Sequence, residues 1–536
     1  MNRASSTPLG TNSRSADPKR PPQSVKNRRT GRPGYLFLWL TLLLFASAAL
    51  AQQQPSPQQN APSGDPAAAP ASAANDAGQI PSSWRQIPVP PLPRWSAAQP
   101  KRIELANGMV FFLQEDHELP LISGEAMVRG GSRSEPASKA GMVEIYGDVW
   151  RTGGSNKMTG DQMDDFLEMR AAKIETDNNK ENTTITFDCL KGDFGDVFPI
   201  FVELLRDPAF SPDKIELAKN EMNTVIARRN DNSEGLADRE AAKLAYGKDN
   251  PYARSPELAT VAAVTRDDLL AWFKQHVAPN NIILGIVGDF DSAEMEKRLR
   301  ATFADWKRGP QVRKPEIALT PAKPGLYAVD KADVNQSQIR FVSLGIERSS
   351  PDYFAVQVMN QVLSGGFTSR LLADLRTKRG LAYEVGGGLQ AGWDHRGVFW
   401  LTIATKSAST VDAIEGMRED LAKFKTDPPT PDELKFAKEA ILNSLIFRFD
   451  TPEKVLRERM VYEFYGFPLD YLERFRAGIE KVTVADVNRV VQKYVHPEEF
   501  AVLVVGNMSR FGKPLTAVGP VTKIDISAQA AAAAAR

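Results

Sequence analysis

The chain has 536 residues, more than one hydrophobic core normally holds, which predicts two to four domains. Its 67 basic and 66 acidic residues nearly cancel, so no global basic field points to nucleic acid and no acidic tail is present. Cys189 is the only cysteine; it excludes an internal disulfide, and its place in the apolar run "TITFDCL" predicts a buried, inert thiol.

The N-terminal segment is typical of an exported protein. A basic stretch, "KNRRTGRPG", precedes the apolar run "YLFLWLTLLLFASAALA", which ends in Ala49-Leu50-Ala51. This pattern predicts a signal peptide over residues 1–51, cleaved after Ala51, and a periplasmic or secreted protein. The alternative is an uncleaved anchor in the inner membrane, because an apolar run of roughly 17 residues approaches the length of a membrane span.

Low-complexity sequence flanks a folded body. Residues 52–95 are rich in Gln, Pro, Ala and Ser and predict a disordered tether. The body begins with two predicted strands, "MVFFLQED" (109–116) and "LISGEAMVRGG" (121–131). At the far end, residues 513–536 predict a low-complexity tail that closes in a run of alanines.

The segment "GMVEIYGDVWRTGG" (141–154) predicts an amphipathic helix. Its apolar residues recur at helical spacing and line one buried face: Met142, Ile145, Tyr146, Val149 and Trp150. The opposite face carries Glu144, Gly147, Asp148 and Arg151. A solvated polar face is the simplest interpretation; the alternative is a Ca²⁺ or Mg²⁺ site that uses the carboxylates of Glu144 and Asp148, one turn apart.

Further along, "KIETDNN" (173–179) and "TTITFDCL" (183–190) predict a pair of strands. Helices are predicted over 193–207, 211–231, 234–247 and 291–306. Ser211 with Pro212 predicts an N-terminal cap, and Asp291 with Glu294 predicts a capping box. Mixed helices and strands predict an α+β fold with mostly antiparallel sheets.

Two stretches of the body repeat each other. "VTRDDLLAWFKQHVAPNNIILGIVGDF" (264–290) aligns without a gap with "VTVADVNRVVQKYVHPEEFAVLVVGNM" (482–508), 218 positions later. Each copy predicts a capped helix, a proline turn and a buried strand. The body therefore divides into two homologous halves, residues 98–310 and 325–512, joined by a proline-rich linker at 311–324.

Several of these motifs together resemble the pitrilysin/insulinase family of zinc metallopeptidases, the inverzincins. In the first half they are "GGSRSEP", the 141–154 helix, "YGKDNPYARSPE" and "NNIILGIVGDF"; in the second half, "GGFTSRLLADLRTKRGLAYEV". The resemblance covers nearly the whole body. It implies two homologous α+β halves that face each other like a clamshell around a peptide-binding chamber.

Zinc chemistry in this family depends on an H-x-x-E-H helix, in which two imidazoles hold Zn²⁺ and the glutamate acts as general base. The resemblance places Glu144 at the first histidine position, Gly147 at the base position and Asp148 at the second histidine position. A distal glutamate ligand falls near Thr224 or Val225, where Glu221 is the nearby acid. We therefore expect this chain to bind no zinc.

The second half keeps the other functional feature of the family, an arginine and a tyrosine that contact the substrate and stabilise the tetrahedral intermediate. They match Arg376 and Tyr383, at the end of a helix predicted from about 368 to 380 and the start of a strand near 382. The alternative is structural: an arginine that favours the helix dipole and a tyrosine that packs on the core.

Three functions remain open. The first is a non-catalytic subunit of a heterodimeric periplasmic zinc endopeptidase. The partner subunit would carry H-x-x-E-H and the zinc, and this chain would contribute Arg376 and Tyr383 to the partner's site. The second is a stand-alone peptide-binding module, with "AKIETDNN" as a candidate edge strand. The third is a hydrolase with an unrecognised site, although the sequence has no Ser-His-Asp elbow, Cys-His arrangement or P-loop.

Overall fold

The computed structural model describes residues 99–526. The predicted signal peptide and tether, and the last ten residues of the predicted tail, lie outside the described residues. Within 99–526, no helix combines the length and the apolar character that a membrane crossing requires. Residues 99–526 belong to a single structural unit.

The first half is built on a six-stranded sheet, in the neighbour order β1-β2-β6-β3-β5-β4. Its strands are β1 (Lys101–Glu104), β2 (Val110–Glu115), β3 (Leu121–Arg129), β4 (Lys173–Asn178), β5 (Asn182–Leu190) and β6 (Ile282–Gly288). β2 and β6 pair in parallel, and every other neighbouring pair is antiparallel. The predicted strands of this half are confirmed, and β4 is an edge strand.

The second half has a similar six-stranded sheet in the order β10-β12-β8-β13-β7-β14, except that β14 pairs in parallel with β7 whereas β1 pairs antiparallel with β2. Its strands are β7 (Gly325–Asp330), β8 (Gln336–Leu344), β10 (Glu384–Leu389), β12 (Val398–Lys406), β13 (Ala501–Gly506) and β14 (Val521–Lys523). β13 pairs in parallel with β7 and antiparallel with β8, as β6 does with β2 and β3. A short parallel pair, β9 (Ile346–Glu347) with β11 (Ala391–Gly392), lies beside it.

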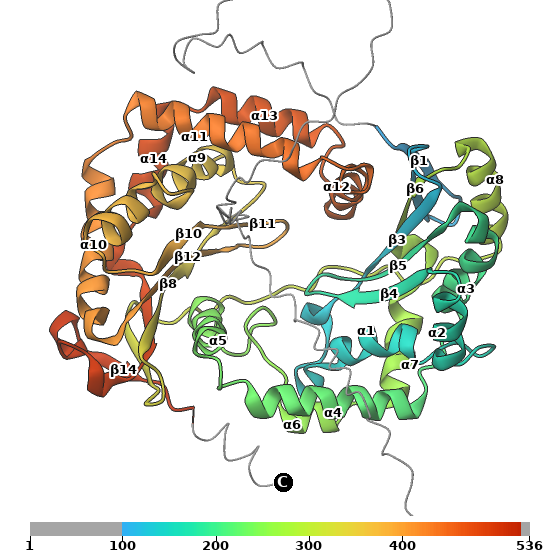
Figure 1. Cartoon of the computed structure of the whole chain (residues 1–536), viewed down its shortest axis with the longest axis horizontal. Coiled ribbons are helices and arrows are strands. Elements are labelled where there is room, and N and C mark those ends of the chain that lie inside the picture. The colour runs from blue at the N-terminus through green and yellow to red at the C-terminus, as the bar shows by residue number, and fades with distance from the viewer. Residues whose placement is uncertain (1–98, 527–536) are drawn as a thin grey trace, which may run out of the picture. The chain divides into compact units, whose positions relative to one another are not determined.

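Helices surround both sheets (Figure 1). The first half contains α1 (Met142–Thr152), α2 (Gly160–Glu168), α3 (Phe194–Arg206), α4 (Pro212–Arg228), α5 (Ser233–Tyr246), α6 (Leu258–Ala262), α7 (Arg266–His276) and α8 (Ser292–Phe303). The second contains α9 (Tyr353–Ser364), α10 (Thr410–Thr426), α11 (Pro431–Ser444), α12 (Pro452–Tyr465), α13 (Tyr471–Lys481) and α14 (Val484–Tyr494). The predicted α+β class with two homologous halves is confirmed.

The repeated stretches fold alike down to their caps. Thr265 begins α7 and Thr483 begins α14, and each forms a capping box with the aspartate three residues later. A proline-led turn then leads into β6 in the first half and β13 in the second. Because these interactions are local, the short repeated sequence is enough to specify them.

Both sheets are covered on two faces, because their central strands are apolar on both sides. In β13, Val502 and Val504 pack into the main core of the second half, whereas Leu503 and Val505 pack on the opposite face. Such an uninterrupted apolar strand has no solvent-facing side. Helices must therefore cover the second face of each sheet.

The two halves exchange helices to provide this cover. α5 of the first half packs on β8 and β13 of the second, and α12 of the second half packs on β2 and β6 of the first (Figure 1). Leu456 and Met460 of α12 are both buried there, against strand residues that include Phe112. α5 and α12 occupy corresponding places in the repeat, so the exchange is reciprocal.

Some boundaries differ from the predictions. The second half extends past residue 512, because β14 pairs with β7 in the segment assigned to the tail. Ser211 precedes α4 without a side-chain capping bond, and Asp291 caps α8 alone through two backbone N–H groups. The helix expected over 368–380 is a short π-helical segment, η6 (Leu372–Lys378), and β10 begins one residue after Tyr383.

Candidate functional site

Helix α1 is held in place by its apolar face and by a carboxylate at its start. The five predicted core residues are all buried, and Trp150 Nε1 donates to the carbonyl of Leu204 at 2.8 Å. The buried Glu135 accepts hydrogen bonds from the backbone N–H groups of Gly141 and Val143. Burial nevertheless raises the pKa of Glu135, against the effect of these two donors. A carboxylate there also favours the helix dipole.

The polar face of α1 is only partly the solvated surface expected from the sequence. Glu144 and Asp148 are exposed, but Gly147 is buried. Strand β4 lies against it: Thr176 Oγ1 donates to the carbonyl of Gly147 at 2.6 Å, and a Cβ atom at 147 would meet Asn178 Nδ2 at 2.4 Å. The side chain of Asn178 thus takes up the space beside the general-base position.

The Glu144 side chain is accessible to solvent, but the surrounding protein removes part of the hydration of its carboxylate. This desolvation raises its pKa, the nearby Glu135 raises it further, and Lys180 opposes the shift. The direction of this pKa shift indicates a recessed position for the carboxylate. Burial in turn lowers the pKa of Lys180, whose charge Glu135 and Glu144 favour. Sequence reasoning missed this lysine.

The residues present at the degenerate motif do not fit zinc. Its three positions supply two carboxylates and no imidazole, and α4, which packs beside α1, presents Thr224 and Val225 at the distal position. Within residues 99–526, the group of three metal-capable side chains that come together is His496, Glu498 and Glu499, in and next to η9 (Pro497–Glu499). It includes no residue of α1, and His496 Nδ1 lies 3.2 Å from Lys425 Nζ.

In the second half, Arg376 and Tyr383 are both solvent-exposed. Arg376 projects from η6 with its guanidinium 5.8 Å from the ring centre of Phe367, which is itself exposed. Tyr383 directly precedes the edge strand β10; its backbone N–H donates to Ala404, and 59% of the residue is exposed. The structure brings both residues to the η6–β10 corner, far in the sequence from the α1 positions.

Ion pairs and one buried side chain anchor η6 to helix α10. Arg379 pairs with Asp374 and Glu419 and lies 3.5 Å from Asp420 of α10. Leu375 is buried beside Gly416 of the same helix. Short π-helical segments are rare in proteins, and those that occur are often found at functional sites. Here the segment turns Arg376 outward while its neighbours anchor it.

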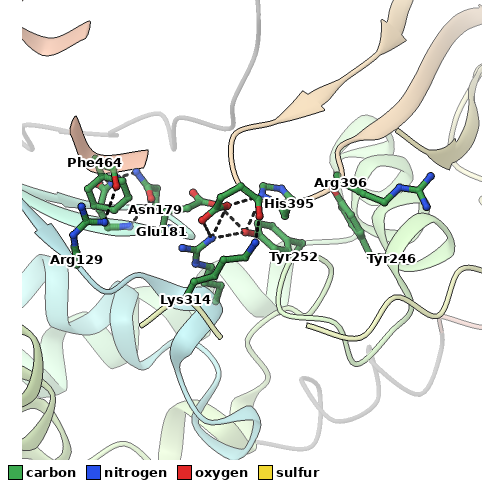
Figure 2. A network of polar contacts seen from close by, with 12 residues as sticks. Arg129, Asn179, Glu181, Tyr246, Tyr252, Lys314, His395, Arg396 and Phe464 are labelled. Carbon is green, nitrogen blue, oxygen red and sulfur yellow. Dashed lines mark hydrogen bonds and ion pairs between the residues drawn. The ribbon is translucent and has the colours of Figure 1, made fainter. Parts of the chain in front are cut away.

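A second polar cluster, missed by sequence reasoning, joins the two halves. Arg133, in η2 (Ser132–Ser134), donates to both carboxylate oxygens of Asp394 at 2.9 Å and to Tyr252 at 3.0 Å. The Tyr252 ring stacks on His395 at 4.0 Å, and its hydroxyl donates to Glu181 (Figure 2). The motif "GGSRSEP" contains Arg133, but nothing in the sequence identifies its partners.

The histidines and the cysteine have structural surroundings. His276, at the end of α7, is buried; its ring stacks on Trp272 at 3.7 Å, and its Nδ1 lies 2.9 Å from the carbonyl oxygen of the same residue. His117 lies on the surface beside Asp289. Cys189 is buried as predicted, and burial raises the pKa of its thiol to about 12.

Comparisons with known proteins agree with this architecture. The family profile described as "Insulinase (Peptidase family M16)" matches residues 114–252, and "Peptidase M16 inactive domain" matches residues 263–441. The fold is similar to the crystal structure of a peptidase M16 inactive domain from Pseudomonas fluorescens, with a TM-score of 0.70 and 24% identity over 78% of this chain and all of that one. A Helicobacter pylori protease structure gives a TM-score of 0.66 at 17% identity, covering 76% of this chain and all of that one.

Two curated relatives span the same body. A non-peptidase homolog, YmxG, from Helicobacter pylori is 24% identical over 77% of this chain and 95% of its own length. An uncharacterized zinc protease, also YmxG, from Bacillus subtilis is 20% identical over 76% of this chain and 99% of its own length. Two homologous α+β halves, each with a six-stranded sheet, are shared with these M16 structures. The chain belongs to the insulinase family, peptidase family M16.

Proposed function

We propose that this protein is a non-catalytic subunit of a periplasmic zinc endopeptidase. A homologous partner supplies the H-x-x-E-H helix and its zinc, and this chain supplies Arg376 and Tyr383 to the partner's site. The observation that carries the proposal is a contrast: Gly147 is buried under β4 beside Asn178, whereas Arg376 and Tyr383 are exposed.

The absence of peptidase activity from the isolated chain follows from the first part of this contrast. A metallopeptidase needs a metal-bound water and a base to polarise it. Glu144 and Asp148 offer oxygen ligands without the imidazoles that zinc prefers, and Gly147 has no side chain to act as base. The non-peptidase homolog of Helicobacter pylori is consistent with this reading.

The availability of Arg376 and Tyr383 supports the second part. Within residues 99–526, no carboxylate forms an ion pair with Arg376 and no side chain or carbonyl hydrogen-bonds to the Tyr383 hydroxyl. An exposed guanidinium can hold a peptide carbonyl or carboxylate, and a phenol can donate to a developing oxyanion. A residue that served only the packing of its own half would be buried or paired.

The alternative is a stand-alone module that binds extended peptides. It is favoured by the edge strands β4 and β10, each of which pairs on one side only within the described sheets. An extended chain can add to such an edge through backbone hydrogen bonds.

The cellular location is part of the same proposal: cleavage after Ala51 would release the protein into the periplasm.

The test combines this chain with an H-x-x-E-H homologue from the same cell and measures peptide cleavage per assembled pair. Tyr383→Phe removes one hydroxyl, and we expect kcat to fall by about 10²–10³, as for loss of one oxyanion donor. Arg376→Ala should also raise KM. Tyr327→Phe is the matched control, since the Tyr327 hydroxyl only donates to the nearby carbonyl of Lys323.

Unchanged kcat with Tyr383→Phe would remove the catalytic contribution. If no pair assembles, yet the isolated chain binds extended peptides, the stand-alone alternative is favoured. Lower melting temperature in the Tyr383→Phe variant, with unchanged turnover per pair, would assign the residue a purely structural role.

A further inference from the structure

A cavity of about 230 Å³ lies where the first half, the linker and the second half meet. Four cationic side chains line it, Arg129, Arg133, Arg313 and Lys314, together with the acidic Glu181 and Asp394. With one charge each, four cations and two acids leave this lining with an excess of two positive charges.

Only one of the two acids is neutralised by a cation, and the charge of the other, Glu181, remains in the lining. Both carboxylate oxygens of Asp394 accept from Arg133, so these two charges cancel. Glu181 accepts from the hydroxyl of Tyr252 at 2.9 Å (Figure 2). The cations that remain are Arg129, Arg313 and Lys314, and within residues 99–526 none of them forms an ion pair with a carboxylate.

Arg129 is the most informative of the three, because it is partly buried and forms no ion pair among residues 99–526; Glu463 and Asp394 favour its charge without outweighing burial. Its Nη1 donates to the carbonyl of Phe464 at 2.6 Å, and its guanidinium lies 4.4 Å from the ring centre of Phe464. Burial lowers its pKa, which means that the surroundings disfavour the charge. A partly buried cation is costly unless an anion is brought to it.

Lys314 and Arg313 complete the positive side of the cavity. Lys314 Nζ donates to the backbone carbonyl of Asp394, which positions it over the junction (Figure 2). Arg313 precedes it in the linker and is exposed. A guanidinium offers two parallel N–H donors to a planar or tetrahedral oxyanion, and a lysine adds a third charge-assisted bond.

We propose that this cavity binds a small oxyanion, a carboxylate or a phosphate, held by Arg129, Arg313 and Lys314. The anion comes either from a free small molecule or from the carboxylate of a peptide chain. The proposal does not depend on the role of Arg376 and Tyr383. Because the cavity lining comes from both halves and the linker, an occupant stabilises their contact.

The probes are inorganic phosphate and a pair of short acetylated peptides, one with a free C-terminal carboxylate and one with a C-terminal amide. Calorimetry and thermal melting are run on the mature chain at constant ionic strength, with chloride as the balancing anion. We expect saturable binding with a rise in Tm. Arg313→Gln and Lys314→Gln should each weaken it about tenfold, which corresponds to about 1.4 kcal/mol.

Lys435→Gln is the control, since it removes an equal charge from an exposed position on α11. Because Arg313 and Lys314 are exposed linker residues, their substitution leaves the cores intact and circular dichroism should be unchanged. Competition by phosphate with the free-carboxylate peptide, but not with the amide, assigns the peptide as a source; phosphate binding alone assigns a free anion. No saturable binding, or equal affinity in all variants, would overturn the proposal.

Discussion

Arg133 and Asp394 are 261 positions apart in the sequence, yet Arg133 Nη1 lies 2.9 Å from each carboxylate oxygen of Asp394. The arginine side chain is 7% exposed and that of the aspartate 21%. This ion pair therefore joins the two halves at a place where little water could hydrate either charge if its partner were removed.

Asp394→Ala should lower the free energy of unfolding by about 3 kcal/mol, because it leaves the Arg133 charge buried and unpaired. Urea denaturation at neutral pH measures it. Removing both charges, as Arg133→Met with Asp394→Leu, should be less harmful than Asp394→Ala. The exposed pair Lys297–Glu294 is the control, and its loss should change stability by less than about 0.5 kcal/mol. A small effect of Asp394→Ala would show that the halves do not depend on this contact.

Acid should weaken the same contact. Burial opposes ionisation of Asp394, but hydrogen bonds from His395 and Arg133 outweigh it and lower its pKa. A carboxyl whose folded pKa is lowered stabilises the fold above its unfolded pKa, and this contribution is lost as pH falls through the folded value. In wild type, stability should fall below about pH 4 more steeply than in Asp394→Ala, as urea midpoints at each pH would report. Parallel pH profiles would contradict this expectation.

The exchange of α5 and α12 should make the halves interdependent. Met460→Ala should cost about 2–4 kcal/mol, because Met460 is fully buried against the first-half sheet. Gly285→Ala should also destabilise, since its Cβ would lie 2.4 Å from Met460 Sδ. Combined with Met460→Ala, the Gly285 substitution should lose most of its penalty. Additive effects of the two substitutions would show that Met460 of α12 does not pack against Gly285 of β6.

A buried carboxyl in the second half predicts a stability loss at rising pH. Burial and the nearby Asp374 raise the pKa of Asp420 to about 7, against the opposing effect of Arg379. The raised folded pKa means that the folded state holds a proton between about pH 4 and 7 that the unfolded state has released, so stability falls as pH rises through this window. Asp420→Asn should remove the slope and gain up to about 2 kcal/mol at pH 7.5, allowing for solvent screening.

Thermal melts from pH 4.5 to 8 test this prediction. Asp188→Asn, an exposed position on β5, serves as the control and should keep the wild-type profile. A pH profile that is the same in wild type and in the Asp420→Asn variant would mean that Asp420 holds no extra proton in the folded state.

The purified chain should hold no stoichiometric zinc after dialysis, because Glu144, Gly147 and Asp148 provide neither imidazole nor base. Restoring His-x-x-Glu-His by substitutions at these three positions should give weak binding only. The distal position on α4 still lacks an acid, and glutamate at 147 must displace Asn178. Metal analysis decides between these outcomes; one tightly held zinc per wild-type chain would overturn the reading.

The sequence alone determined the features that depend on neighbours along the chain. The capping boxes at Thr265 and Thr483 and the apolar stripe of α1 are specified within a few residues. The repeat of these local signals was enough to predict two halves. The absence of histidine from residues 141–154 is likewise a matter of residue types, which the sequence states in full.

The contacts between residues distant in the sequence became visible in the folded structure alone. Asn178 lies over Gly147, and Lys180 lies near Glu144, because β4 packs against α1. The helix exchange, the Arg133–Asp394 pair and the basic cavity each bring together residues far apart in the sequence. No local pattern encodes such contacts. These contacts form only in the folded chain, because each depends on the burial of surfaces that no single segment can cover alone.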